Sequence, residues 1–169
     1  MESLLNDPSL RGEYTSIEDI IAPGAKELPD HKWYVMRASY CRAQKAVERI
    51  TKYGALTFLP TECKSKVIKG VRHWKKVPCS PTLFFIYGTY EKVRSFTRRN
   101  NQTEEAIPYV DFTFDHTVKD CYGKDTIMTV PFLEMQNFIR MVEAAVPESY
   151  SVTPQEIHYK PGGMVRVTE

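Results

Sequence analysis

The chain has 169 residues with a formal net charge of +2, and 42% of its residues are hydrophobic and 26% charged, a composition typical of one globular domain with a sizeable core. This length excludes a second large domain, and the composition excludes wholesale disorder. No run approaches the roughly 20 apolar residues that a membrane-spanning helix needs, and the first ten residues carry acids where a leader peptide would carry bases, so we expect a cytoplasmic protein.

Charge is unevenly distributed along the chain. Residues 1–30 contain seven acidic and two basic side chains, a balance of −5. Residues 64–76 contain no acid and have a balance of +6 from Lys64, Lys66, Lys69, Arg72, Lys75 and Lys76. This placement predicts an anionic partner for the basic stretch, or else a solvated loop.

The first 31 residues are predicted to form an acidic N-terminal extension, because Pro23 and Gly24 interrupt any regular element there. Within it, Thr15 and Glu18 have the spacing of a capping box before a short helix whose apolar face is Ile17, Ile20 and Ile21. We expect this helix to dock on the globular part or to fray. We expect the globular domain to cover residues 32–147.

The next three elements follow from local patterns. Residues 33–38 are aromatic and β-branched and predict a strand. Apolar residues at spacings of three and four predict a helix over 41–53, with Ser39 as its N-cap and Gly54 at its C-terminus. Residues 55–59 predict a second strand.

The middle of the chain predicts a hairpin, a strand and a helix. Residues 66–72 form two strand arms that meet near Gly70, a hairpin with a cationic tip. The apolar run 83–87 is typical of a strand at the centre of a sheet. Helical spacing then predicts a short helix with a cationic flank, its apolar side being Tyr90, Val93 and Phe96.

The last two elements complete an α+β order. Alternation over 110–115 predicts a strand with one face on the core and the other in water. A final helix is predicted to begin after Val130 and Pro131 and to end at Pro147. Strands and helices joined by short connections predict a mostly antiparallel sheet flanked by helices.

Three segments in this order resemble the NusG family of transcription elongation factors, and most closely its UpxY-like antiterminator branch from Bacteroides-type bacteria. They are residues 33–35 leading into the first helix, the basic hairpin followed by 81–85, and the terminal segment 160–167. The resemblance implies an NGN-like domain over residues 32–147. It also implies that 148–169 form a linker and the first strand of a truncated KOW barrel.

The resemblance implies a function without enzymatic activity or cofactor. Such a domain binds the clamp helices of the largest subunit of bacterial RNA polymerase and suppresses pausing or termination, here on capsular-polysaccharide operons. The apolar depression that receives the clamp helices would consist of Pro81, Leu83, Phe85, Met135 and Phe138. Family members usually carry an aromatic residue before the proline and a tyrosine two residues after it, whereas this chain has Ser80 and Leu83.

The resemblance also implies contacts to nucleic acid and none to a membrane or to a small-molecule substrate. The hairpin would point toward upstream DNA, and the region of the second helix would read the non-template strand. The residues concerned are Lys66, Lys69, Arg72, Lys75, Arg94, Arg98 and Arg99. We further hypothesise that the acidic extension lies across the basic hairpin or the depression and competes with the partner there.

Two other classes of function stay open. An enzyme has little support, because the four histidines are scattered, no nucleophile–base spacing stands out, and a solvated strand face accounts for Asp111, Asp115, His116 and Asp120 as well as a metal site does. A free-standing RNA-binding module remains possible in principle, since such modules combine a sheet bearing exposed aromatics with basic edges.

Overall fold

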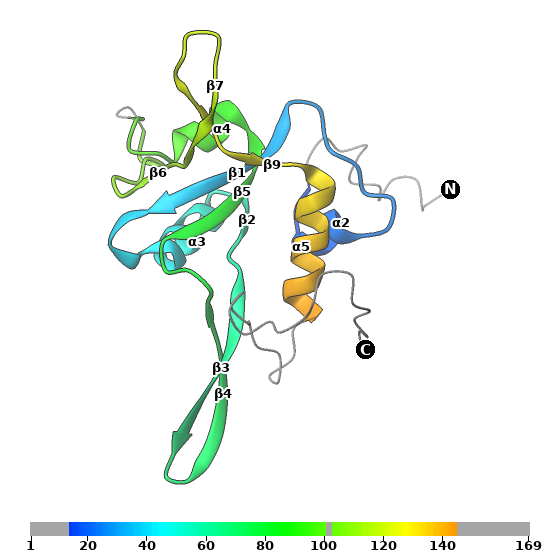
Figure 1. Cartoon of the computed structure of the whole chain (residues 1–169), viewed down its shortest axis with the longest axis vertical. Helices are drawn as coiled ribbons and strands as arrows, with labels where there is room; N and C mark the ends of the chain where they lie inside the picture. The colour runs from blue at the N-terminus through cyan, green and yellow to red at the C-terminus, as the bar shows by residue number, and fades with distance from the viewer. Residues whose placement is uncertain (1–13, 101–102, 145–169) are drawn as a thin grey trace, which may run out of the picture.

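The structure is a computed structural model that describes residues 14–100 and 103–144. It is an α+β fold whose main sheet has the strand order β2-β5-β1-β6, with β9 also paired to β1, and every pairing is antiparallel (Figure 1). The strands of the main sheet are β1 (His31–Ala38), β2 (Leu56–Phe58), β5 (Leu83–Thr89), β6 (Val110–Phe112) and β9 (Thr129–Val130). The predicted α+β class, the mostly antiparallel sheet and its two central strands are confirmed.

One face of the main sheet, here called the α3 face, packs against α3 (Ala43–Lys52) and α4 (Tyr90–Ser95). Because side chains alternate along a strand, the even-numbered residues of β1 and β5 supply this core. Its fully buried members include Met36, Ala46, Ile50, Phe84, Ile86, Val93 and Phe96. The apolar side predicted for α3 is therefore confirmed as core, and so are Val93 and Phe96 of the next predicted helix. Tyr90, also predicted for the apolar side of that helix, is 45% exposed.

The start of α3 differs from the prediction. Ser39–Cys41 form a 3-10 turn in which Tyr40 and Cys41 have left-handed φ angles of 60° and 56°. These two residues turn the chain sharply between β1 and the helix, so the helix begins at Ala43 with Arg42 at its N-cap, and Ser39 is not the cap. Its C-terminal end is as predicted, because Gly54 follows with a φ of +77°.

The opposite face, here called the α5 face, is covered in part by α5 (Phe132–Ala144) and α2 (Ile17–Ile21). Residues 14–30, which we call the N-terminal strap, dock here: Tyr14, Ile20 and Leu28 are buried. The docking of the predicted short helix is confirmed, and folded structure extends upstream of the expected start at residue 32. The helix cap is Ser16, which accepts a hydrogen bond from the Asp19 N–H at 3.2 Å, and not the predicted Thr15.

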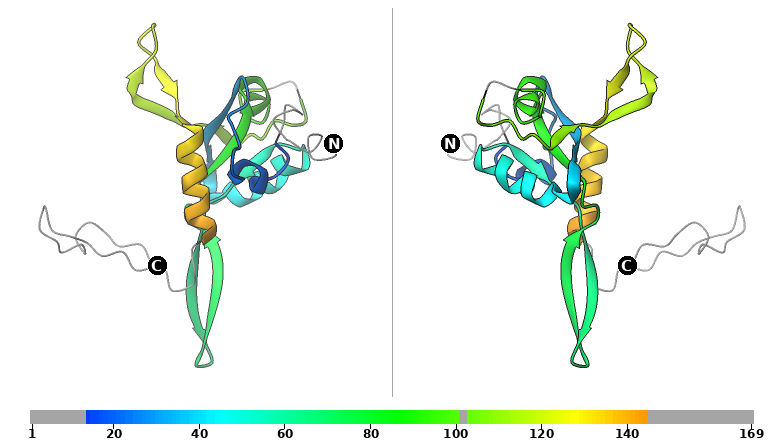
Figure 2. Two further views of the ribbon diagram at one scale, coloured as in Figure 1. Left: turned by 90° about the vertical axis from the view of Figure 1, so that its right-hand side faces the viewer. Right: turned by 90° about the vertical axis from the view of Figure 1, so that its left-hand side faces the viewer.

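Two hairpins project from the body in opposite directions, and α5 runs between them (Figures 1 and 2). The basic hairpin pairs β3 (Thr61–Ile68) with β4 (Val71–Pro78), so it is longer than the predicted 66–72. Its turn is Lys69-Gly70, and both residues have positive φ, as two-residue hairpin loops require.

The second hairpin, β7 (Phe114–Lys119) with β8 (Asp125–Ile127), was not predicted. It exists because the expected strand 110–115 is interrupted at Thr113, whose N–H bonds to the Val35 carbonyl while its own carbonyl accepts from Met128. The chain leaves the main sheet at that point and returns as β9. None of the helices in the described ranges is both long and apolar enough to cross a bilayer. The predicted KOW strand lies outside the described residues.

Candidate functional site

An apolar surface patch lies on the α5 face, where α5 leaves part of the sheet uncovered. Leu83 and Phe85 are two residues apart on β5, so both side chains lie on the α5 face. Phe84, between them, is buried on the α3 face. Leu83 is 37% exposed, and Phe85 and Phe138 are half-buried. We call Leu83, Phe85 and Phe138 the apolar patch.

Three phenylalanine rings hold this patch together. The Phe85 ring lies 6.0 Å from that of Phe138 and 6.5 Å from that of Phe58, and Phe58 meets Phe138 edge-on at 6.1 Å. Edge-to-face rings at these separations contribute about 0.5–1.5 kcal/mol beyond burial alone. The contact therefore fixes α5 against β2 and β5, and it sets the shape of the patch.

The other two residues predicted for the depression are placed differently. Met135 is 1% exposed and belongs to the core beneath α5, so it supports the patch from behind and does not face solvent. Pro81 is exposed in the loop before β5, where its carbonyl accepts a hydrogen bond from the Ala43 N–H at 3.0 Å. Of the five residues predicted for the depression, Leu83, Phe85 and Phe138 are thus the ones that lie together on the α5 face and are at least partly exposed.

The basic hairpin is fully solvated along its outer part, since every residue from Lys64 to Lys76 is exposed. Its register places Lys64 opposite Lys75. Cations directly opposite one another on an antiparallel pair destabilise it. Lys64 alone of these has a recorded ion pair in the described ranges, with Glu62 at 2.8 Å, and this bond raises the pKa of Lys64.

The arginines after α4 converge on one carboxylate at the edge of the sheet. Arg98 and Arg99 each donate from Nε to Asp111, at 2.8 and 3.0 Å. Together with Arg37 they line a hollow of about 460 Å³, which we call the arginine hollow. Arg94 is exposed on α4 and does not line it. Three arginines against one aspartate leave this hollow cationic.

The apolar patch and the arginine hollow share a face of the sheet. Arg37 on β1 pairs with Leu83 on β5 and with Asp111 on β6, and directly opposed residues point to the same side. Sequence reasoning missed Arg37 and Asp111 as site residues, because a charged residue in a strand pattern was taken as solvated. Arg37 follows Met36 and Asp111 precedes Phe112, and both apolar residues are buried. This alternation in the sequence could have indicated that Arg37 and Asp111 lie on the opposite face of the sheet.

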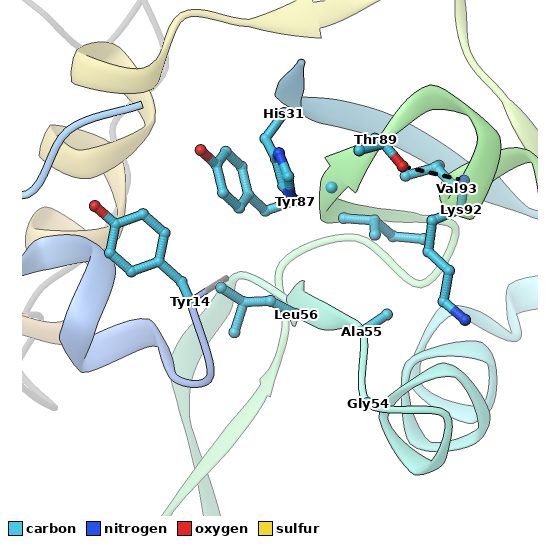
Figure 3. A pocket seen from close by; sticks show the side chains of 11 residues that line it. Tyr14, His31, Gly54, Ala55, Leu56, Tyr87, Thr89, Lys92 and Val93 are labelled. Carbon is cyan, nitrogen blue, oxygen red and sulfur yellow. Dashed lines mark hydrogen bonds between the residues drawn. The ribbon is translucent and has the colours of Figure 1, made fainter. Parts of the chain in front are cut away.

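A second hollow, of about 220 Å³, lies between the strap and the other end of β5 (Figure 3). The rings of Tyr14 and Tyr87 face it from one side, and Lys92 comes from α4 with its N–H bonded to Thr89 Oγ1 at 3.4 Å. The Tyr87 hydroxyl accepts from the Leu28 N–H at 2.9 Å, and burial raises the pKa of Tyr87 to about 12. No predicted site residue lines this hollow.

Of the acidic residues considered for a metal site, Asp111 is the partner of Arg98 and Arg99, whereas Asp115 and Asp120 hold the second hairpin. Asp115 accepts hydrogen bonds from Thr117, and Asp120 accepts from the N–H groups of Tyr122 and Lys124. These bonds lower the pKa of Asp115. Across the two described ranges, no cluster of three or more His, Cys, Asp or Glu side chains could hold a metal ion.

Six of the seven predicted nucleic-acid residues therefore form two separate groups, one on the basic hairpin (Lys66, Lys69, Arg72 and Lys75) and one at the arginine hollow (Arg98 and Arg99). Arg94 on α4 belongs to neither group. No protein-family model matches the chain, and a search of curated proteins finds no match. The functional argument accordingly rests on the geometry of the apolar patch, the basic hairpin and the arginine hollow.

Proposed function

We propose that this chain contains a NusG-type NGN domain, a transcription elongation and antitermination factor of the UpxY-like kind. It docks on the clamp helices of the largest subunit of bacterial RNA polymerase through the apolar patch. The observation that carries the proposal is that α5 covers the α5 face incompletely, which leaves Leu83 exposed beside the half-buried rings of Phe85 and Phe138. The family assignment itself comes from the sequence resemblance.

The patch has the physical character that docking on a helical hairpin requires. Helix recognition depends on apolar anchors that fill a partner's hydrophobic surface, and a few central anchors supply most of the free energy of binding. Here the anchors stand on a strand and a helix that the three phenylalanine rings hold rigidly together. Rigid anchors lose little conformational entropy when a partner binds.

The cationic groups extend the same surface toward nucleic acid. Arg37 and the arginine hollow adjoin Leu83 on the α5 face, and the basic hairpin projects beyond the body of the domain. Lysines and arginines in such positions contact phosphates without reading sequence. We propose upstream or non-template DNA as their target on the transcribing polymerase.

The mechanism needs no cofactor and no covalent step. A domain that touches both the clamp and the DNA binds the closed, elongating polymerase more tightly than a paused one, because only the closed form offers both contacts together. Any ligand shifts an equilibrium by its difference in affinity for the two states. The larger this difference in affinity, the less often the polymerase pauses or terminates. Capsular-polysaccharide operons as targets rest on the sequence resemblance alone.

The first prediction concerns Leu83. Substituting Leu83→Glu places a charge in the apolar patch, and we expect the affinity of the full chain for purified bacterial RNA polymerase to fall roughly 30-fold, the loss typical of a central anchor worth about 2 kcal/mol. Surface plasmon resonance measures the affinity, and circular dichroism checks the fold.

Leu133→Glu is the matched control. Leu133 is an exposed leucine on α5, 65% exposed, outside the apolar patch. We expect this variant to bind polymerase like the parent chain. A folded Leu83→Glu variant that binds polymerase with unchanged affinity would show that the patch is not the docking surface.

A free-standing RNA-binding module is the competing function. Its signature would be tight binding of a short RNA without polymerase, an affinity that falls steeply with salt, and indifference to Leu83→Glu. The fold gives such a module little support, because helices pack on both faces of the main sheet and the most exposed aromatic residues, Tyr40 and Tyr122, lie in turns. The same two variants therefore separate the two functions.

A further inference from the structure

We propose that the basic hairpin enters a groove of double-stranded DNA and presses an apolar wedge at its tip against a base step, which kinks the duplex. This inference rests on the proposed contact with DNA and gives it a specific form. The hairpin would then act as a DNA-bending arm. A loose electrostatic contact along the phosphates would need neither an apolar tip nor cations on both faces of the hairpin.

The tip of the hairpin is apolar on both of its faces. Val67, Ile68 and Val71 are 61%, 48% and 58% exposed, and they surround the turn. Ile68 pairs with Val71 on one face, whereas Val67 pairs with Arg72 on the other. Both strands of the outer hairpin are solvated, so these side chains bury nothing within the fold. Side chains that serve only solubility at such a tip would be polar.

The cations also lie on both faces of the hairpin. The register places Lys64, Lys66 and Lys75 on one face and Arg72 and Lys76 on the other, with Lys69 in the turn. Contact with a flat anionic surface needs cations on one face. Insertion between two phosphate backbones engages both faces at once, and it offsets the repulsion between Lys64 and Lys75.

The dimensions of the hairpin suit B-form DNA. Each arm has eight residues, which span about 26 Å at the usual rise of a strand. Two-stranded ribbons enter either groove of B-DNA, and apolar side chains inserted between base steps from the minor groove kink the duplex. The major groove of A-form RNA is too deep and narrow for such an arm. Binding of single strands relies on aromatic stacking, for which the hairpin offers only His73 and Trp74.

The experiment uses the full chain and a 24-base-pair duplex with a fluorescent donor and acceptor at its ends. The tip variant is V67S/I68S/V71S, and the charge variant is K66Q/K75Q. We expect the parent chain to bind the duplex and to raise energy transfer. The tip variant should bind roughly tenfold more weakly, because the wedge loses its apolar burial, and should lose the change in energy transfer while keeping the salt dependence.

The charge variant should behave in the opposite way. Each phosphate contact contributes about 0.9 to the slope of log affinity against log salt, so the slope should fall by roughly 2 while bound duplex remains bent. Val118→Ser on the second hairpin is the matched control, since Val118 is 51% exposed and also lies in a projecting hairpin. It should bind and bend the duplex like the parent chain.

Three results would overturn the inference: no duplex binding by the full chain, a tip variant that bends DNA as well as the parent, or a preference for single-stranded DNA or for duplex RNA of equal length. The binding of polymerase by the parent chain and by Leu83→Glu shows whether the DNA-bending inference or the proposed docking on polymerase has failed. If polymerase binding depends on Leu83 but the duplex stays straight, only the wedge is wrong. If the duplex bends but polymerase does not bind, the docking proposal is wrong.

Discussion

Adjacent residues of β5 lie in different environments although they look alike in the sequence. Phe84 and Ile86 are fully buried on the α3 face, while Phe85 is half-buried and Leu83 is exposed on the other. The apolar run 83–87 predicted a central strand, and this prediction is confirmed. It could not predict how exposed Leu83 is, because the exposure of Leu83 depends on which part of the sheet α5 leaves uncovered.

Tyr87 carries a prediction about alkaline pH. Burial raises the pKa of its hydroxyl from 10.0 to about 12, so the folded chain keeps a proton that the unfolded chain releases above pH 10. The free energy of unfolding should therefore be at its full value below pH 10 and should decline between pH 10 and 12. Urea unfolding at pH 8, 10 and 11 measures this decline.

Tyr87→Phe tests whether Tyr87 is the group responsible. The variant leaves the Leu28 N–H without its partner, so we expect it to be less stable at pH 8 by about 1–2 kcal/mol. Its stability should nevertheless fall less between pH 10 and 11 than that of the parent chain. An equal decline in both proteins would assign the effect to other groups.

At the scale of elements, the strap and α5 hold each other in place. Gln136 is 5% exposed and donates from Nε2 to the Ile20 carbonyl at 2.6 Å, and Arg140 donates to the Ile21 carbonyl at 2.7 Å. These are carbonyls at the end of α2, which have no partner within the helix. Side chains of α5 thus complete the hydrogen bonding of α2.

We predict that Gln136→Leu loosens the strap. The Ile20 carbonyl would lose its buried partner, and a cost of about 1–3 kcal/mol in the free energy of unfolding is expected for such a group. Limited proteolysis should then cut within residues 14–30 faster than in the parent chain. Gln44→Leu on α3 is the matched control, because Gln44 is exposed and bonds only to Glu48. Equal proteolysis of both variants would contradict the role given to Gln136.

The sequence predicted those elements whose signals are local. The periodicity of α3 and the β-branched and aromatic residues of β1 depend only on neighbouring residues, and both elements are present, although α3 begins two residues later than expected. The docking of the strap depends on Gln136 and Arg140, more than a hundred residues away. The β7–β8 hairpin depends on bonds between Thr113, Val35 and Met128. No local pattern contains those contacts.

At the scale of the molecule, the described part of the acidic extension, residues 14–30, packs on the α5 face. Residues 14–30 contact α5 and the main sheet, and the basic hairpin is exposed from Lys64 to Lys76. The strap supports the helix that bears Phe138, so its position is structural. The basic and apolar surfaces were recognisable from composition and resemblance, whereas the arginine hollow needed the pairing of β1 with β6 to bring Arg37 beside Asp111.

The two contact surfaces predict additive effects on polymerase bound to a DNA scaffold. Leu83 stands on the main sheet and Lys66 and Lys75 on the projecting hairpin, so neither substitution alters the surroundings of the other (Figure 1). In the combined variant L83E/K66Q/K75Q, we expect the losses in binding free energy to add within about 0.5 kcal/mol. Titration at one salt concentration measures all three variants. A coupling above about 1 kcal/mol would indicate that the two surfaces are not independent.

The bond between Gln136 and Ile20 joins residues 116 positions apart, and it has a consequence for the order in which the chain is made. During synthesis the amino-terminal strap leaves the ribosome long before its partner helix exists. The rings of Phe58 and Phe85 likewise have no contact with Phe138 until that residue has been synthesised. A nascent chain that ends before α5 therefore lacks the finished apolar patch, so the docking on polymerase that we propose would begin only after α5 has been translated.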